Sequence, residues 1–184
     1  MNTLFIRALL VSSLLAPLAQ AADESVASAP AASAPATASA PAAVAPSKAD
    51  VTKAIAVLES NFLGQDASAA AQTVMQFAQL SKDIAIQLSP KTTLWIFGEA
   101  KPDSQDEEIY RQMLMVAYVA GNLKAQLSAA KPVDSPLAGW KFTLKAYQDI
   151  QAANSKIKIA ELETLKKQQA KGELPKLAAK ALQK

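Results

Sequence analysis

The stretch SQDEEIYRQMLMVAYVAGNLKAQL, residues 104–127, carries the strongest helix signal in this 184-residue chain. Its apolar residues recur at spacings of four and three, as on one face of an α-helix: Ile109, Met113, Val116, Ala120, Leu123 and Leu127. A second apolar row beside the first consists of Tyr110, Leu114 and Ala117. Ser104 and Glu107 have the spacing of a capping box, and Gly121 would let a neighbouring helix cross closely. Because a helix that is apolar around most of its surface must be covered, we expect it at the centre of an all-α fold.

Amphipathic helical patterns lie on both sides of this central segment. Before it, one helix is expected to begin at Ser47 and a second near Asp66. After it, Ser135 followed by Pro136 predicts another helix start, because proline is favoured at the first helical position. A further helical stretch and a short terminal helix around Pro175 complete the pattern.

Residues 81–88 are compatible with two kinds of secondary structure. Ile84 and Leu88 have helical spacing, whereas the alternation of Ile84, Ile86 and Leu88 fits a short strand. Elsewhere alternating patterns are nearly absent, and the chain has only 5 glycines. The sequence therefore predicts one small helical bundle of about five to six helices over residues 47–184.

The first 21 residues have the features of a cleavable secretory signal peptide. Arg7 supplies a positive charge, and the apolar run over residues 8–18 is about 11 residues long, shorter than the roughly 20 that a membrane-spanning helix needs. Ala19-Gln20-Ala21 has the small-x-small pattern of a cleavage site. We therefore expect a periplasmic or secreted protein with no transmembrane segment in the mature chain. A retained membrane anchor is the alternative.

Residues 22–46 form a low-complexity tract rich in alanine, proline and serine, in which Ser-Ala-Pro recurs at 28–30, 33–35 and 39–41. The tract has almost no large apolar side chain whose burial would offset the entropy lost on ordering. We expect a disordered linker. It either spaces the domain from the cleavage site or lets the domain reach a partner.

The composition removes many familiar kinds of catalytic site. The chain has no cysteine and no histidine, which excludes a disulfide, a thiolate nucleophile, an imidazole base and a histidine-ligated metal. Four acids cluster at a predicted helix start, where negative charge is favoured: Asp103, Asp106, Glu107 and Glu108. Their spacing is not that of a calcium loop. The sequence predicts no metal site and no cofactor.

Positive charge is concentrated at the C-terminal end of the chain. The formal net charge is +3, and residues 155–184 hold eight lysines against three glutamates. Such a segment can associate with anionic lipid, lipopolysaccharide or an acidic partner, and a solvated helix face is the alternative. The absence of arginine and aromatic residues among these lysines argues against a nucleic-acid partner.

Three aromatic residues are candidates for lining a binding groove: Trp95, Trp140 and Tyr147. Trp140 and Tyr147 share a helical stripe with Leu137 and Leu144, which favours a place in the core. Trp95 lies in a segment of irregular pattern, so we expect it to be the more exposed of the three.

Three short fragments invite comparison with a known enzyme family: ESNF at 59–62, VMQF at 74–77 and AYVAG at 117–121. Together they resemble parts of the motifs of the lysozyme-like lytic transglycosylases, which are mainly helical enzymes of the cell envelope. The resemblance implies that Glu59 is the general acid in cleavage of a glycosidic bond of peptidoglycan. That role would require Glu59 to face an apolar groove.

The similarity to that family is partial. Thr73 stands where the family has glycine, Val119 stands where it has asparagine, and the matches cover only about a dozen positions. The sequence therefore favours an exported, non-enzymatic interaction or accessory module whose partner is an unknown protein or cell-envelope component. The alternatives are a divergent peptidoglycan-cleaving enzyme that uses Glu59 and association with the envelope surface through the lysine-rich C-terminus.

Overall fold

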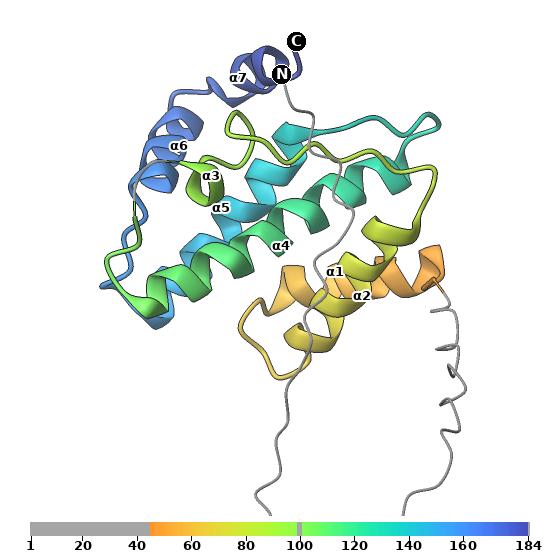
Figure 1. Cartoon of the computed structure of the whole chain (residues 1–184), viewed down its shortest axis with the longest axis horizontal. Helices are drawn as coiled ribbons and strands as arrows, with labels where there is room; N and C mark the ends of the chain where they lie inside the picture. The colour runs from red at the N-terminus through yellow and green to blue at the C-terminus, as the bar shows by residue number, and fades with distance from the viewer. Residues whose placement is uncertain (1–44, 99–100, 184) are drawn as a thin grey trace, which may run out of the picture. The chain divides into compact units, whose positions relative to one another are not determined.

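The computed structural model describes residues 45–98 and 101–183. These residues form seven α-helices and contain no β-strand, which confirms the all-α class (Figure 1). The helices are α1 (Lys48–Ser60), α2 (Ala67–Leu80), α3 (Leu94–Phe97), α4 (Gln105–Ser128), α5 (Pro136–Ala153), α6 (Ala160–Ala170) and α7 (Leu174–Ala181). The number exceeds the expected five to six because the 4 residues of α3 form a separate helical turn. The predicted signal peptide, residues 1–21, and the predicted linker as far as residue 44 lie outside the described residues.

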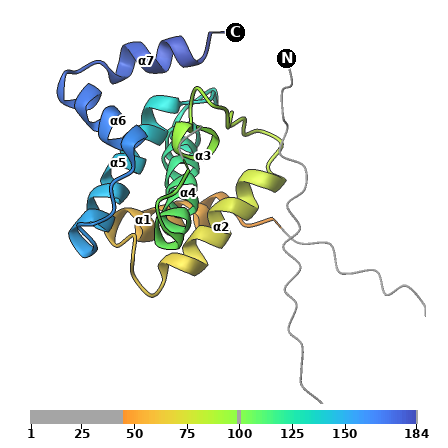
Figure 2. The ribbon, with the colours of Figure 1, turned by 60° about the vertical axis from the view of Figure 1, so that its left-hand side comes forward.

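The long helix α4 and its successor α5 lie side by side at the centre of the bundle, as predicted for α4 (Figures 1 and 2). A Cβ atom at Gly121 would lie 2.5 Å from the carbonyl oxygen of Ala138 and from the Cβ atom of Phe142. A Cβ atom at Gly139 would lie 2.5 Å from the ring of Tyr118. Both helices therefore need glycine where they cross, which confirms the close approach expected at Gly121.

Both predicted apolar rows of α4 contribute to the core, and Ile109 is the exception. Leu114, Ala117 and Tyr118 are fully buried, whereas Ile109 is 50% exposed. The row through Leu114 and Tyr118 continues to the crossing point at Gly121, so contact with α5 sets the rotation of α4. The first row also reaches the interior, for example at the fully buried Leu123, so the expectation fails at Ile109 and is met by the rest of the two rows.

The remaining helices cover this central pair. Helices α1 and α2 pack against each other and against α4, while α6 and α7 lie against α5. The one-turn helix α3 contacts both α4 and α6. One cluster of buried apolar side chains receives residues from every helix named above, for example Leu58 from α1, Leu162 from α6 and Leu174 from α7. Within residues 45–98 and 101–183, no helix combines the length and apolar character required to cross a membrane.

The capping interactions at the two expected serines differ from each other. Ser47 forms a complete capping box, because its Oγ atom accepts from the Asp50 N–H and the Asp50 carboxylate accepts from the Ser47 N–H, both at 3.2 Å. At the start of α4, the Ser104 Oγ atom accepts from the Glu107 N–H at 3.1 Å. One oxygen of the Glu107 carboxylate accepts from Arg111 at 2.8 Å, and the other accepts from the Asp103 N–H at 3.1 Å, one residue before Ser104. The second box is therefore half formed, because its carboxylate returns to the residue before the cap.

Residues 81–88 form an extended segment that is neither helix nor strand. Its alternating apolar residues pack against the core, as those of a strand would: Ile84, Ile86 and Leu88. The side chain of Gln126 replaces a partner strand, since its Nε2 atom donates to the Ala85 carbonyl at 2.9 Å and its Oε1 atom accepts from the Ala85 N–H at 3.3 Å. One side-chain amide thus satisfies the backbone at the middle of the segment.

Candidate functional site

Glu59, the candidate general acid, lies near the end of α1 on the surface of the domain. Its side chain is 43% exposed, and the Nζ atom of Lys124 lies 2.7 Å and 2.6 Å from its two carboxylate oxygens. This ion pair joins α1 to α4. The carboxylate therefore faces an ammonium group and solvent instead of apolar walls.

The other fragments of the suggested enzyme motifs have core positions. Tyr118 is fully buried, and its ring makes an edge contact with the ring of Trp95 at a centroid distance of 6.1 Å. Burial raises the pKa of the Tyr118 phenol. Val119 is 2% exposed, and Met75 packs against the core from α2. The residues around Tyr118 therefore build the contact between helices α4 and α5.

A cleft of about 370 Å³ lies between the start of α1, residues 81–84 and the C-terminal end of α4. Lys48, Ser81, Asp83 and Gln126 supply its polar side chains, and Glu59 is not among the residues that line it. The amide of Gln126 is already bonded to Ala85 and to Asn122. The other polar side chains of the cleft are thus one lysine, one serine and one aspartate.

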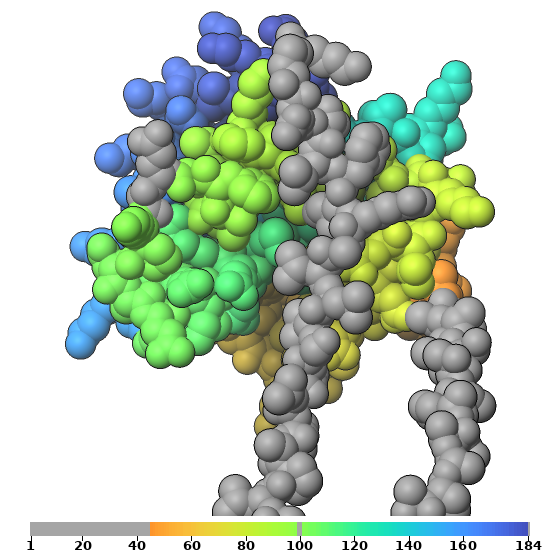
Figure 3. Space-filling view, in the orientation of Figure 1, coloured from red at the N-terminus to blue at the C-terminus, as the bar shows by residue number. Residues whose placement is uncertain are grey.

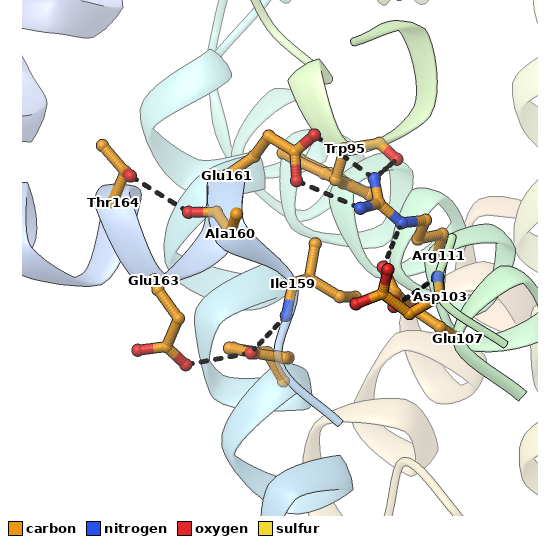
Figure 4. A network of polar contacts seen from close by, with 10 residues as sticks. Trp95, Asp103, Glu107, Arg111, Ile159, Ala160, Glu161, Glu163 and Thr164 are labelled. Carbon is orange, nitrogen blue, oxygen red and sulfur yellow. Dashed lines mark hydrogen bonds and ion pairs between the residues drawn. The ribbon is translucent and has the colours of Figure 1, made fainter. Parts of the chain in front are cut away.

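Arg111 of α4 is a deeply buried charged group, which is 6% exposed and bonds to its own helix and to two other elements (Figure 4). Its Nε atom donates to Glu107 at 2.8 Å, and its Nη1 atom donates to the Trp95 carbonyl oxygen at 2.6 Å. Its Nη2 atom donates to Glu161 of α6 at 3.2 Å. This network joins α3, α4 and α6. Glu107 is predicted from the sequence at the helix start, and Arg111 is not among the predicted site residues, although a spacing of four residues is the local signal of an ion pair.

A second, partly buried network ties α6 to α5. The Tyr147 hydroxyl donates to Glu163 at 2.9 Å and accepts from the Ile159 N–H at 2.9 Å, and Gln151 donates to Glu163 at 2.7 Å. Burial raises the pKa of the Tyr147 phenol. Burial pushes the pKa of Glu163 upward, but the hydrogen bonds from Gln151 and Tyr147, together with the nearby charges of Lys166 and Lys158, hold that pKa below its usual value.

Three acidic side chains of the described residues take part in these two networks: Glu107, Glu161 and Glu163. Among residues 45–98 and 101–183, no group of three or more acidic side chains is placed to hold a metal ion together. Of the four acids at the start of α4, Glu107 is the one that is buried, and its partner is Arg111. These acids therefore serve the helix start and the network below it.

Negative and positive side chains of the C-terminal helices lie on different faces, because Glu161 and Glu163 bond to other parts of the domain. Helix α6 buries Leu162 and Leu165 and leaves Lys167 exposed, and Lys171 follows one helical turn later. Helix α7 buries Leu174 and Ala178. Its exposed side carries Lys176 and Lys180, again one turn apart. We define the lysine surface by four residues: Lys167, Lys171, Lys176 and Lys180.

The lysine surface has no carboxylate partner in the described part of the chain. None of its four lysines forms an ion pair there, whereas Lys124 and Lys145 each do. Helices α6 and α7 follow each other on the same side of the domain (Figure 3). The lysine surface therefore presents uncompensated positive charge.

The candidate aromatic residues are all buried. Trp140 and Tyr147 lie in the core as expected, and the Trp140 Nε1 atom donates to the Thr92 carbonyl at 2.7 Å. Trp95 is only 2% exposed, so the prediction of an exposed ring is wrong. The one-turn helix α3 places this ring against Tyr118, a contact that the local pattern did not indicate.

Comparisons of the chain with protein families, curated proteins and solved structures give no match. The fold and the described contacts define a small all-α domain in which buried ionic networks join the helices and unpaired lysines lie outside.

Proposed function

We propose that this chain is an exported, non-enzymatic helical module that acts by binding a protein or a component of the cell envelope. The proposal places it in the periplasm or outside the cell, on the strength of the signal-peptide pattern over residues 1–21.

The main support for the proposal is that the buried polar side chains bond to other parts of the same domain. Arg111, Glu107 and Glu161 bond to one another and to the backbone of α3, and Asn122 and Gln126 bond to the segments that follow α2 and α4. A catalytic acid or base needs a substrate within hydrogen-bond reach of its reactive atom. Here these polar groups are directed at other parts of the same domain, which supports a structural role for them.

Glu59 supports the same proposal through its position. Its carboxylate is paired with Lys124 at the surface, and the cleft lies elsewhere. A general acid of the glycosidase type depends on an apolar pocket that keeps its proton at neutral pH. The exposed ion pair favours a role in attaching α1 to α4.

The experiment is a peptidoglycan digestion with the chain that begins at Ala22. Wild-type protein, Glu59→Gln and the matched control Lys124→Gln are incubated with purified peptidoglycan, and released soluble fragments are measured. We expect no release by any of the three. Release by wild type and Lys124→Gln, but not by Glu59→Gln, would overturn the proposal and establish Glu59 as the acid.

A further inference from the structure

We infer that the lysine surface of α6 and α7 docks the domain on a bilayer that carries anionic phospholipid headgroups. This inference rests on the proposed function, for which it names the partner.

The glutamates and the exposed lysines of α6 lie on different sides of the helix. Glu161 is held by Arg111 (Figure 4), and Glu163 is held by Tyr147 and Gln151, so both carboxylates bond to other parts of the domain. Lys167 and Lys171 lie on the exposed side. Between the two lysine pairs, Glu173 is the one exposed acid. The stretch is therefore far more cationic toward solvent than its composition indicates.

The packing of α7 within the domain limits how this helix can contact a membrane. A helix that inserts into the headgroup region buries its apolar face there. The apolar face of α7 is already occupied, since Leu174 is 2% and Ala178 is 5% exposed within the domain. Lys176 and Lys180 project from the other side. Helix α7 therefore stays packed in the domain, and its lysines meet the phosphate groups from their exposed positions.

Exposed apolar side chains near the ends of the two segments favour a lipid surface over a wholly polar polyanion. The Nζ atom of Lys91 donates to the Gln183 carbonyl at 3.1 Å, which connects the segment before α3 to the end of α7. Leu94, three residues after Lys91, is 46% exposed, and Leu182, the residue before Gln183, is 45% exposed. Exposed large apolar side chains suit the boundary between headgroups and acyl chains, and a soluble polyanion offers them no partner.

The test measures binding of the chain that begins at Ala22 to sedimented vesicles. The vesicles are either pure phosphatidylcholine or phosphatidylcholine with about one-third phosphatidylglycerol. The variant replaces all four lysines of the lysine surface by glutamine. The matched control replaces four exposed lysines near α1 and the cleft: Lys48, Lys53, Lys82 and Lys131.

Each lysine near an anionic surface strengthens binding by about fivefold. We therefore expect the lysine-surface variant to bind anionic vesicles at least about tenfold more weakly than wild type. The control variant, with the same change of net charge, should stay close to wild type. Binding should weaken as salt is raised and should be absent with pure phosphatidylcholine. Equal losses in both variants, or equal binding to both kinds of vesicle, would overturn the inference.

A second variant addresses the source of the negative charge. Leu94→Ser with Leu182→Ser should weaken vesicle binding and leave binding to inorganic polyphosphate unchanged. Binding of wild type to polyphosphate without binding to anionic vesicles would reject the bilayer. If the protein does not bind vesicles and releases no peptidoglycan fragments, the docking inference is wrong and the proposed binding function is not contradicted. Release of peptidoglycan fragments would instead reject the proposed function, whatever the vesicle result.

Discussion

The Nη1 atom of Arg111 lies 2.6 Å from the carbonyl oxygen of Trp95, so a guanidinium on α4 closes the one-turn helix α3. A helix of 4 residues leaves most of its carbonyl groups without a partner inside the helix. Arg111 satisfies one of them and also holds Glu107 and Glu161. Through this one side chain, the position of Trp95 depends on residues far away along the chain.

Replacing Arg111 by methionine is expected to destabilise the domain by about 3–5 kcal/mol, because it leaves the buried Glu107 carboxylate without its counterion. Urea unfolding followed by circular dichroism measures the change. The matched control is Lys124→Met, which removes an ion pair whose side chains are 51% and 43% exposed and should cost at most about 1 kcal/mol. Equal costs at the two positions would contradict the assignment of Arg111 as the central tie.

The two buried tryptophans should respond differently to replacement by phenylalanine. Trp140 Nε1 donates to the Thr92 carbonyl at 2.7 Å, whereas Trp95 Nε1 has no hydrogen-bond partner in the described part of the chain. Trp140→Phe therefore loses a bond worth about 1 kcal/mol in addition to ring volume, and Trp95→Phe removes an unsatisfied donor. Thermal unfolding should give the lower midpoint for Trp140→Phe. The reverse order would show that the volume lost at Trp95 outweighs the hydrogen bond.

Gln126→Met should release the extended segment 81–88 from α4. The substitution keeps a side chain of similar length but removes both bonds to Ala85, with an expected cost of about 1–3 kcal/mol. Hydrogen exchange should become faster at the Ala85 amide. Gln79→Met, at an exposed position on α2, serves as the control and should change neither quantity. An unchanged exchange rate at the Ala85 amide in Gln126→Met would show that the Gln126 side chain does not hold this segment.

Glu163 predicts a loss of stability in acid. Its pKa is below the usual value in the folded state, so its ionised form stabilises the domain above the unfolded pKa, and this contribution disappears as the pH falls through the folded pKa. The stability gap between wild type and Glu163→Gln should be largest near pH ~7 and should shrink toward pH ~3. Urea midpoints at both pH values measure it. The exposed Glu108→Gln is the control, and a gap that does not change with pH would contradict the prediction.

The helices themselves could be predicted because their signals are local. The spacing of apolar residues over 104–127 and the serine caps at Ser47 and Ser104 depend on neighbours within about one or two turns. The alternation of Ile84, Ile86 and Leu88 likewise indicates which side chains pack against the core. It did not reveal that Gln126, rather than another strand, would satisfy the backbone there.

The candidate site was harder to predict, because a residue's role depends on what packs against it. Glu59 had a motif-like neighbourhood in the sequence, and in the fold it is paired with Lys124, 65 residues away. The three glutamates of the C-terminal stretch looked equivalent, yet two of them point inward. No local pattern separates Glu161 from an ordinary exposed glutamate.

The sequence by itself determined where the helices lie, since helical periodicity and capping act over a few residues. It also determined which chemistries were excluded, because a chain without cysteine and histidine cannot supply those side chains. Only the tertiary structure decided the rotation of α4, the burial of Trp95 and the sorting of charge on α6. Those features follow from the glycine crossing of α4 with α5 and from the bond of Arg111 to Glu161 across 50 residues. Such contacts exist only once distant helices have packed together.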